Sequence, residues 1–264
     1  MPFSWWQILI LAVLQGVAEF LPISSSGHLV VLAPLLFGTS EAPTDMTAVT
    51  VALHIGTLGS ILVYYNRRIA RLLGEDRGTL GLIVIGSIPA AVVGLLIELG
   101  NEQIIEQPLL AGCMLPVTGG VLLWMSRRPA GTTEYRDMSW RSALVVGLSQ
   151  AAAILPGLSR SGLTIAAGVG TGLSRASAAA FSFLLAIPVI GGAGLLKLLL
   201  TDQQPATPVS LLFMGGGVAF IVGIAALWCL DRMLQRGRLH WFAWYCIALG
   251  LAVIAWQLSA IFNP

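Results

Sequence analysis

The sequence predicts an all-α integral membrane protein with about six transmembrane helices, two re-entrant helix-loop-helix hairpins and an inverted-topology repeat. Three observations lead to this prediction: the composition, the long apolar runs, and two apolar segments interrupted near their middle by Pro, Ser and Gly. Of the 264 residues, 56% are hydrophobic and only 10% are charged, too few charges to cover a water-soluble domain. We therefore expect one transmembrane domain over residues 1–264. The formal charge of +2 gives no indication of a nucleic-acid partner.

Six apolar runs are long enough to cross a bilayer core of about 30 Å, which takes roughly 20 helical residues. They are Met46–Tyr65, Thr79–Ile97, Pro108–Met125, Ser177–Leu200, Val209–Leu230 and Trp241–Phe262. Arginines gather in three of the intervening gaps, around Arg67, Arg127 and Arg232. Because basic residues are enriched in cytoplasmic loops, these gaps should be cytoplasmic, and the acidic stretch 98–106 should face the other side.

Two further apolar segments, Trp5–Leu36 and Ser142–Leu173, each contain a loop rich in Ser and Gly. Unpaired backbone groups at membrane depth are tolerated only where protein buries them or where they line a watery cavity. We therefore expect each segment to form a re-entrant hairpin. The alternative is that each segment makes two half-length crossings with the loop outside the membrane.

The two interrupted segments align with each other when the chain is shifted by 135 residues. The shift places Gln15 on Gln150 and Ser24 on Ser159, and it also pairs Ser26 with Ser161 and Gly27 with Gly162. Each half, about 1–130 and 135–264, would then hold one hairpin followed by three crossings. Because three is odd, the second half starts on the opposite side of the membrane, as in the inverted repeats of transporters. The two loops should meet near the midplane and form one site.

The polar residues in and before the two loops favour phosphate binding. Glu19 follows Gln15 by one helical turn, and a carboxylate buried in an apolar segment is costly enough to mark a functional site. Arg160 matches phosphate oxygens, and the start of a half-helix adds N–H groups and a positive dipole end. Ser25 and His28 add a potential nucleophile and a potential base. A Glu19–Arg160 ion pair that only locks the two halves together is the structural alternative.

Segments Gln15–Leu29 and Pro156–Thr164 resemble the two signature regions of the bacterial undecaprenyl-diphosphate phosphatase family. The resemblance covers essentially the whole chain, including Ala52–Leu58 and Phe181–Pro188. It implies hydrolysis of undecaprenyl diphosphate to the monophosphate and phosphate, which recycles the carrier lipid for peptidoglycan synthesis, and an association with bacitracin resistance. It further implies a multi-pass protein of the bacterial inner membrane, with an active site open to the periplasmic side.

The resemblance also implies roles for individual residues. Glu19 would be the essential acidic residue and Arg160 the diphosphate clamp, with Ser25 as nucleophile and His28 as base or rival nucleophile. Either His28 or Glu19 could accept the serine proton, and the sequence does not choose between these two bases. The pocket would be completed by Ser24, Ser26, Gly27, Ser159, Ser161 and Thr164. A divalent cation, Mg²⁺ or Ca²⁺, would be held by Glu19 and Gln15. The family often has an acidic residue at position 15, so weaker or differently shaped cation binding is expected here.

A flippase or scramblase of the polyprenyl phosphate lipid is the alternative function, because an inverted repeat with broken helices suits a transporter equally well. A pure transporter would need no nucleophile beside Arg160, so Ser25→Ala should leave transport largely intact. The expected partners are the polyprenyl diphosphate lipid and the membrane lipids, and a homodimer is left open. His54 lies within a predicted crossing and is interpreted as a packing residue in preference to a second base.

Overall fold

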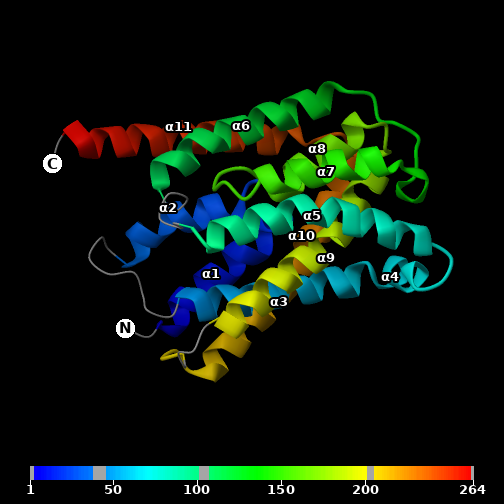
Figure 1. Cartoon of the computed structure of the whole chain (residues 1–264). Coiled ribbons are helices and arrows are strands. Elements are labelled where there is room, and N and C mark those ends of the chain that lie inside the picture. The colour runs from blue at the N-terminus through cyan, green and yellow to red at the C-terminus, as the bar shows by residue number, and fades with distance from the viewer. Residues whose placement is uncertain (1–2, 38–45, 101–106, 201–204, 263–264) are drawn as a thin grey trace.

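The computed structural model describes residues 3–37, 46–100, 107–200 and 205–262, and over these ranges it contains eleven α-helices and no strand. The all-α prediction is therefore confirmed. The helices long and apolar enough to cross a membrane are α3 (Met46–Tyr64), α5 (Arg77–Glu98), α6 (Pro108–Arg127), α9 (Arg175–Leu200), α10 (Val209–Gln235) and α11 (His240–Phe262). They correspond one for one to the six predicted crossings, and Figure 1 shows them running along the length of the molecule.

Two features at one end of the bundle were not predicted. Helix α10 continues five residues past the predicted limit of Leu230, because Leu230 and Leu234 lie one turn apart on a face that is buried in the core. The arginine-rich gap after α3 contains a short helix of its own, α4 (Asn66–Leu72). Hydropathy alone does not reveal either feature, since both lie where charged residues have already ended the apolar run.

The two interrupted segments form pairs of short helices, as expected of re-entrant hairpins. The first pair is α1 (Trp5–Ala18) and α2 (Ser25–Phe37), and the second is α7 (Trp140–Ala152) and α8 (Arg160–Gly170). Their lengths of 11 to 14 residues fall short of the roughly 20 that a crossing takes. In Figure 1 the two hairpins open toward opposite ends of the molecule and turn in its middle.

The packing of the hairpins is that expected if the two halves are exchanged by a two-fold axis. Helix α1 of the first hairpin packs against α10, and α7 of the second hairpin packs against α5. Helices α5 and α10 are equivalent in the two halves, because each precedes the last crossing of its half. Helices α6 and α11, the last of each half, pack against each other. The equivalence of residues 1–130 with 135–264 stays a prediction.

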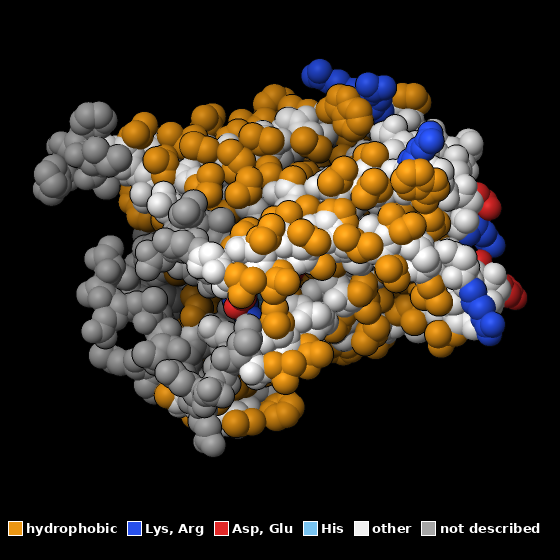
Figure 2. Space-filling view, viewed as in Figure 1, with side chains coloured by type: hydrophobic (Ala, Val, Ile, Leu, Met, Phe, Trp, Pro, Cys, Tyr) orange, Lys and Arg blue, Asp and Glu red, His pale blue; other side chains and the backbone are white. Residues whose placement is uncertain are grey.

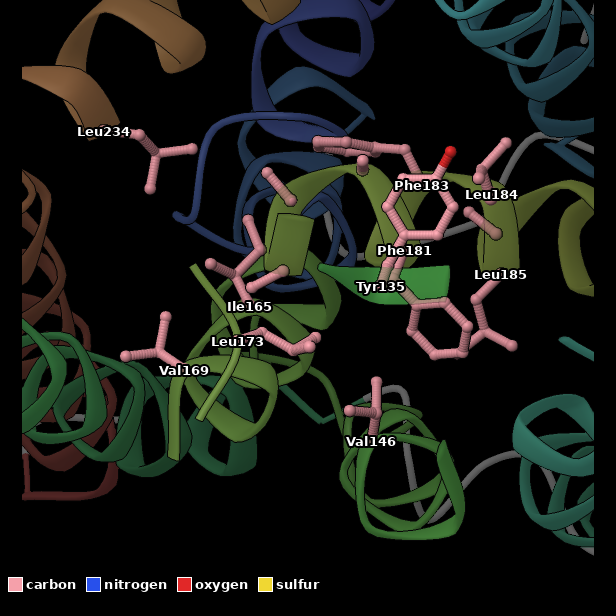
Figure 3. Packing of buried hydrophobic residues seen from close by; sticks show 14 of the residues in the cluster. Tyr135, Val146, Ile165, Val169, Leu173, Phe181, Phe183, Leu184, Leu185 and Leu234 are labelled. Atoms are coloured by element: carbon pink, nitrogen blue, oxygen red, sulfur yellow. The ribbon is translucent and has the colours of Figure 1, made fainter. Parts of the chain in front are cut away.

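The largest buried cluster lies where α8 and α9 meet the arginine-rich end of the bundle. Figure 3 shows its packing around α9, with Phe181, Phe183, Leu184 and Leu185 from that helix, together with Tyr135, Val146, Ile165, Val169, Leu173 and Leu234. Figure 2 shows apolar side chains over the flank of the bundle, whereas charged side chains gather at the end that holds α4. This distribution suits a bundle surrounded by lipid, and the cluster fixes the position of α8.

Candidate active site

The two hairpin loops meet directly. A Cβ atom on Gly27 would lie 2.9 Å from both Cα and N of Gly157, so only glycines allow this approach. Ser24 joins the loops, because its Oγ accepts hydrogen bonds from the N–H groups of Gly27 at 3.2 Å and Gly157 at 3.1 Å. Ser24 has a φ of 70°, a left-handed conformation that costs free energy in a residue other than glycine.

A cavity of about 420 Å³ lies beside this junction and contains most of the predicted site residues. Among them, the residues that line it are Glu19, Ser24, Ser25, Ser26, Ser159, Arg160 and Ser161. The wall also includes the first turns of α3, at Thr50 and Val51, and the last turns of α9, at Ala193 and Gly194. These are the ends of α3 and α9 that lie away from the arginine-rich gaps. The cavity therefore opens toward the end opposite to the arginines.

The carboxylate of Glu19 is the centre of the polar contacts in this cavity. Arg160 Nη2 donates to Glu19 Oε1 at 2.6 Å, and Ser25 Oγ donates to Glu19 Oε2 at 2.9 Å. Gln15 Nε2 donates to the same Oε2 at 3.0 Å, so the amide in α1 and the acid that directly follows the helix contact each other one turn apart, as their spacing predicts. Only 6% of the Glu19 side chain is exposed. The ion pair expected as a structural alternative exists, and a serine hydroxyl shares its carboxylate.

Arg160 is held by its place at the start of α8. Ser159 caps the helix, with its Oγ accepting from the N–H of Gly162 at 3.1 Å. The guanidinium carbon lies 5.8 Å from the centre of the Phe183 ring, a cation–π contact that fixes the orientation of the side chain. Its Nη1 is buried without a hydrogen-bond partner. A buried cationic N–H without an acceptor is costly, so this atom is suited to an anionic ligand.

The first turns of two half-helices, α2 at Ser25 and α8 at Arg160, border the same cavity. The N-terminal N–H groups of a helix carry partial positive charge and favour anions. The first and second hairpins thus each bring one positive helix end to the cavity. Together with Arg160, this arrangement favours a ligand with several negative charges, such as a diphosphate.

The two histidines lie differently from the sequence-based interpretation. His28 does not line the cavity: its Nε2 lies 2.7 Å from Tyr245 Oη, its Nδ1 lies 2.8 Å from the carbonyl of Ser24, and its ring stacks on Tyr245. His54, interpreted as a packing residue, does line the cavity, and its Nε2 lies 3.9 Å from Glu19 Oε2. His54 therefore lies closer to the Glu19 carboxylate than His28 does.

Two threonines support the second loop, and of these only Thr164 was predicted. Thr164 Oγ1 donates to the carbonyl of Arg160 at 2.7 Å and lies 2.6 Å from Ser182 Oγ, outside the cavity. Sequence reasoning missed Thr118, whose Oγ1 donates to the carbonyl of Gly157 at 2.8 Å and accepts from the N–H of Ser159 at 3.0 Å. Nothing in the sequence around Thr118 distinguishes it from other threonines in apolar helices.

Comparison of the sequence with known proteins identifies the family of the chain. Residues 8–252 match the family described as "Bacitracin resistance protein BacA". The chain belongs to this family. It is 48% identical over 96% of its length to a protein of Rhodopirellula baltica named undecaprenyl-diphosphatase, of which it covers 98%. Proteins with the same name from Pelotomaculum thermopropionicum (42% identical, 94% of this chain, 95% of that protein) and Mycobacterium leprae (38% identical, 95% and 94%) are also similar. Both loops of the cavity lie within the part that matches the BacA family.

Proposed function

We propose that the protein hydrolyses undecaprenyl diphosphate to undecaprenyl phosphate and phosphate, and so recycles the lipid carrier of peptidoglycan synthesis. The observation that carries the proposal is the Ser25–Glu19–Arg160 contact at the meeting point of two helix N-termini. Membership of the BacA family and the shared name of the relatives support the same reaction. An arrangement that only joined the two halves would not need a hydroxyl on the shared carboxylate.

In the proposed mechanism, Ser25 Oγ forms a bond to the terminal phosphorus while the bond from that phosphorus to the bridging oxygen breaks. The leaving group is undecaprenyl phosphate. Glu19 Oε2 already accepts the Ser25 hydrogen bond at 2.9 Å, so it is placed to accept the proton. Attack of a water on the phosphoserine then releases phosphate and restores the Ser25 hydroxyl. His28, the other base that the sequence left open, lies against Tyr245 instead.

Arg160 and the two helix ends would supply most of the catalysis through charge. Phosphoryl transfer depends mainly on positioning and on stabilising charge at the non-bridging oxygens. Arg160 Nη1 is buried without a partner in the protein, and Nη2 is held by Glu19, so the guanidinium is fixed and keeps one donor for a ligand. A fixed cation of this kind is not reorganised during the reaction, which is what makes such stabilisation effective.

We include a divalent cation, Mg²⁺ or Ca²⁺, in the proposal. Gln15 Oε1 is buried without a hydrogen-bond partner, and the same amide contacts Glu19 through Nε2. An orphaned amide oxygen on a residue that touches a carboxylate fits a hard cation. Mg²⁺ is commonly held by one or two carboxylates together with substrate phosphates, so one acidic residue is enough. Glu19 and Gln15 would hold the ion, which when bound would neutralise charge on the diphosphate oxygens.

We further propose that the protein resides in the bacterial inner membrane with its cavity open to the periplasm. The arginine-rich gaps lie at one end of the six crossings, and such gaps are cytoplasmic in bacterial membrane proteins. The cavity opens toward the other end. A single cysteine can be placed at the arginine-rich end of the bundle and exposed to a labelling reagent outside intact cells. Labelling of that cysteine would contradict this orientation.

The test is phosphate release from undecaprenyl diphosphate by protein purified in detergent. We expect release by the native chain, inhibition by a chelator, and no release by Ser25→Ala or Arg160→Ala. Folding of both variants is checked by gel filtration and by helical circular dichroism. If the well-folded native chain releases no phosphate, the phosphatase is excluded and lipid transport becomes the first hypothesis. Transport that survives Ser25→Ala in vesicles would then support the flippase or scramblase.

A further inference from the structure

Gln150 is a polar residue of the cavity to which the mechanism above gives no role. It lies in the last turn of α7, only 2% of its surface is exposed, and it lines the cavity that holds Glu19 and Arg160. Both polar atoms of its side chain, Nε2 and Oε1, are buried without a hydrogen-bond partner. Buried amides without partners are rare in folded proteins, so an amide of this kind points to a partner that is absent from the protein itself.

The relation between the two halves explains why this amide is left without a partner. Gln15, aligned with Gln150 by the shift of 135 residues, donates through Nε2 to Glu19 one turn later. The residue one turn after Gln150 is Ile154, which offers no acceptor. The first hairpin supplies an acceptor for the N–H of its glutamine, whereas the second hairpin supplies none for Gln150 at the wall of the cavity.

The chemistry of the cavity indicates which ligand Gln150 meets. Arg160 Nη1 is a second buried donor without a partner, and both residues line the same space. Two unsatisfied donors require an acceptor with several oxygens, and a phosphoryl group has three. A neutral amide adds a donor without a further charge, so the balance between Glu19 and Arg160 is kept. The amide Oε1 could accept from a water or from a protonated phosphate oxygen.

We propose that Gln150 is a further substrate-binding residue, whose Nε2 donates to a phosphate oxygen of the bound diphosphate beside Arg160 Nη1. The inference rests on the proposed function, because it identifies a second contact to the same substrate. It assigns the second hairpin two donors, Arg160 and Gln150, and the first hairpin the nucleophile and the acid.

The test compares Gln150→Leu, which removes both polar atoms at nearly constant size, with the native chain. A hydrogen bond to a charged group is worth about 10- to 100-fold in binding, so kcat/KM for undecaprenyl diphosphate should fall by about that factor. The thermal midpoint should be unchanged or higher, because an unsatisfied buried amide has been removed. A structural role predicts the opposite pair of results, namely a lower midpoint and little change in kcat/KM per folded molecule.

A matched control is Thr79→Val on α5. Thr79 Oγ1 is also buried without a partner but lies outside the cavity, so this substitution should leave kcat/KM unchanged with an equal or higher midpoint. Gln150→Glu gives an independent check, since a carboxylate of the same shape should repel the diphosphate and lower kcat/KM at least as far as Leu does. Native kcat/KM in both Gln150 variants would overturn the proposal.

Binding of inorganic pyrophosphate, followed by the thermal shift it causes, separates this inference from the proposed function. We expect pyrophosphate to raise the midpoint of the native chain and of Thr79→Val, and to raise that of Gln150→Leu less. If the native chain releases no phosphate but shows this pattern, the phosphatase fails and the anion contact stands. If phosphate is released and pyrophosphate stabilises Gln150→Leu as it does the native chain, the contact fails and the phosphatase stands.

Discussion

Replacing Arg160 with Met should destabilise the protein more than replacing both members of its ion pair. Removing one partner of a buried pair leaves an uncompensated charge, which costs about 3–5 kcal/mol. Glu19 keeps its hydrogen bonds from Ser25 and Gln15, and 17% of the Arg160 side chain is exposed to the cavity. Both facts place the expected loss at the lower end, about 3 kcal/mol.

The double variant Glu19→Gln with Arg160→Met should lose only about 1 kcal/mol, because no unpaired charge remains and the amide keeps one hydrogen bond. The coupling between the two sites would then be about 2 kcal/mol or more. The assay is reversible unfolding in mixed micelles of dodecyl sulfate, followed by circular dichroism. Arg236→Met, which removes an exposed arginine from the end of the bundle, is the control and should change the free energy of unfolding by less than about 0.5 kcal/mol. The reasoning would be refuted if the loss of unfolding free energy in the double variant equalled the sum of the losses in Arg160→Met and Glu19→Gln measured singly.

Three further outcomes are expected. Gly56→Ala should lower the free energy of unfolding by about 1–3 kcal/mol, because its Cβ would lie 2.1 Å from the carbonyl oxygen of Gly216 and force α3 away from α10. The control Gly217→Ala meets no atom within 4 Å and should be neutral or stabilising in the same unfolding assay. Tyr245→Phe keeps the ring stacked on His28 but removes a hydrogen bond, so stability should fall by about 1 kcal/mol and kcat by less than tenfold; a loss equal to that of Ser25→Ala would show that His28 takes part in the chemistry. Phosphate release should stop in chelator and return with Mg²⁺ or Ca²⁺, measured at constant ionic strength, and release that persists at full rate in chelator would exclude the cation.

The crossings could be predicted because lipid imposes a length and a hydropathy on each of them. All six predicted runs became helices, and the errors lie where that constraint ends, at α4 and at the last turn of α10. The contact between the two loops was also accessible, because the shift of 135 residues indicated that distant serine-rich segments are related. Glu19 and Arg160 were recognisable from the cost of placing charges in apolar segments.

The geometry around the histidines could not be predicted. His28 follows Ser25 by three residues, which suggested a base near the nucleophile, but its ring turns toward Tyr245 on α11, more than two hundred residues away in the chain. His54 lies in an apolar helix, within the segment Ala52–Leu58 that shares the family resemblance, and it reaches Glu19 only through the packing of α3 beside α1. The direction of a side chain within a loop depends on contacts from other helices, and a single sequence does not encode these locally.

The hydroxyl of Ser24 determines how accurately the two hairpins are aligned. One oxygen holds an N–H from each loop tip, so the spacing between the groups of the first hairpin and those of the second depends on that atom. Glycine at this position would suit the left-handed backbone but supply no acceptor, and alanine would supply neither. Any residue without a hydroxyl here would therefore let the two loop tips shift relative to each other, although each hairpin would stay intact.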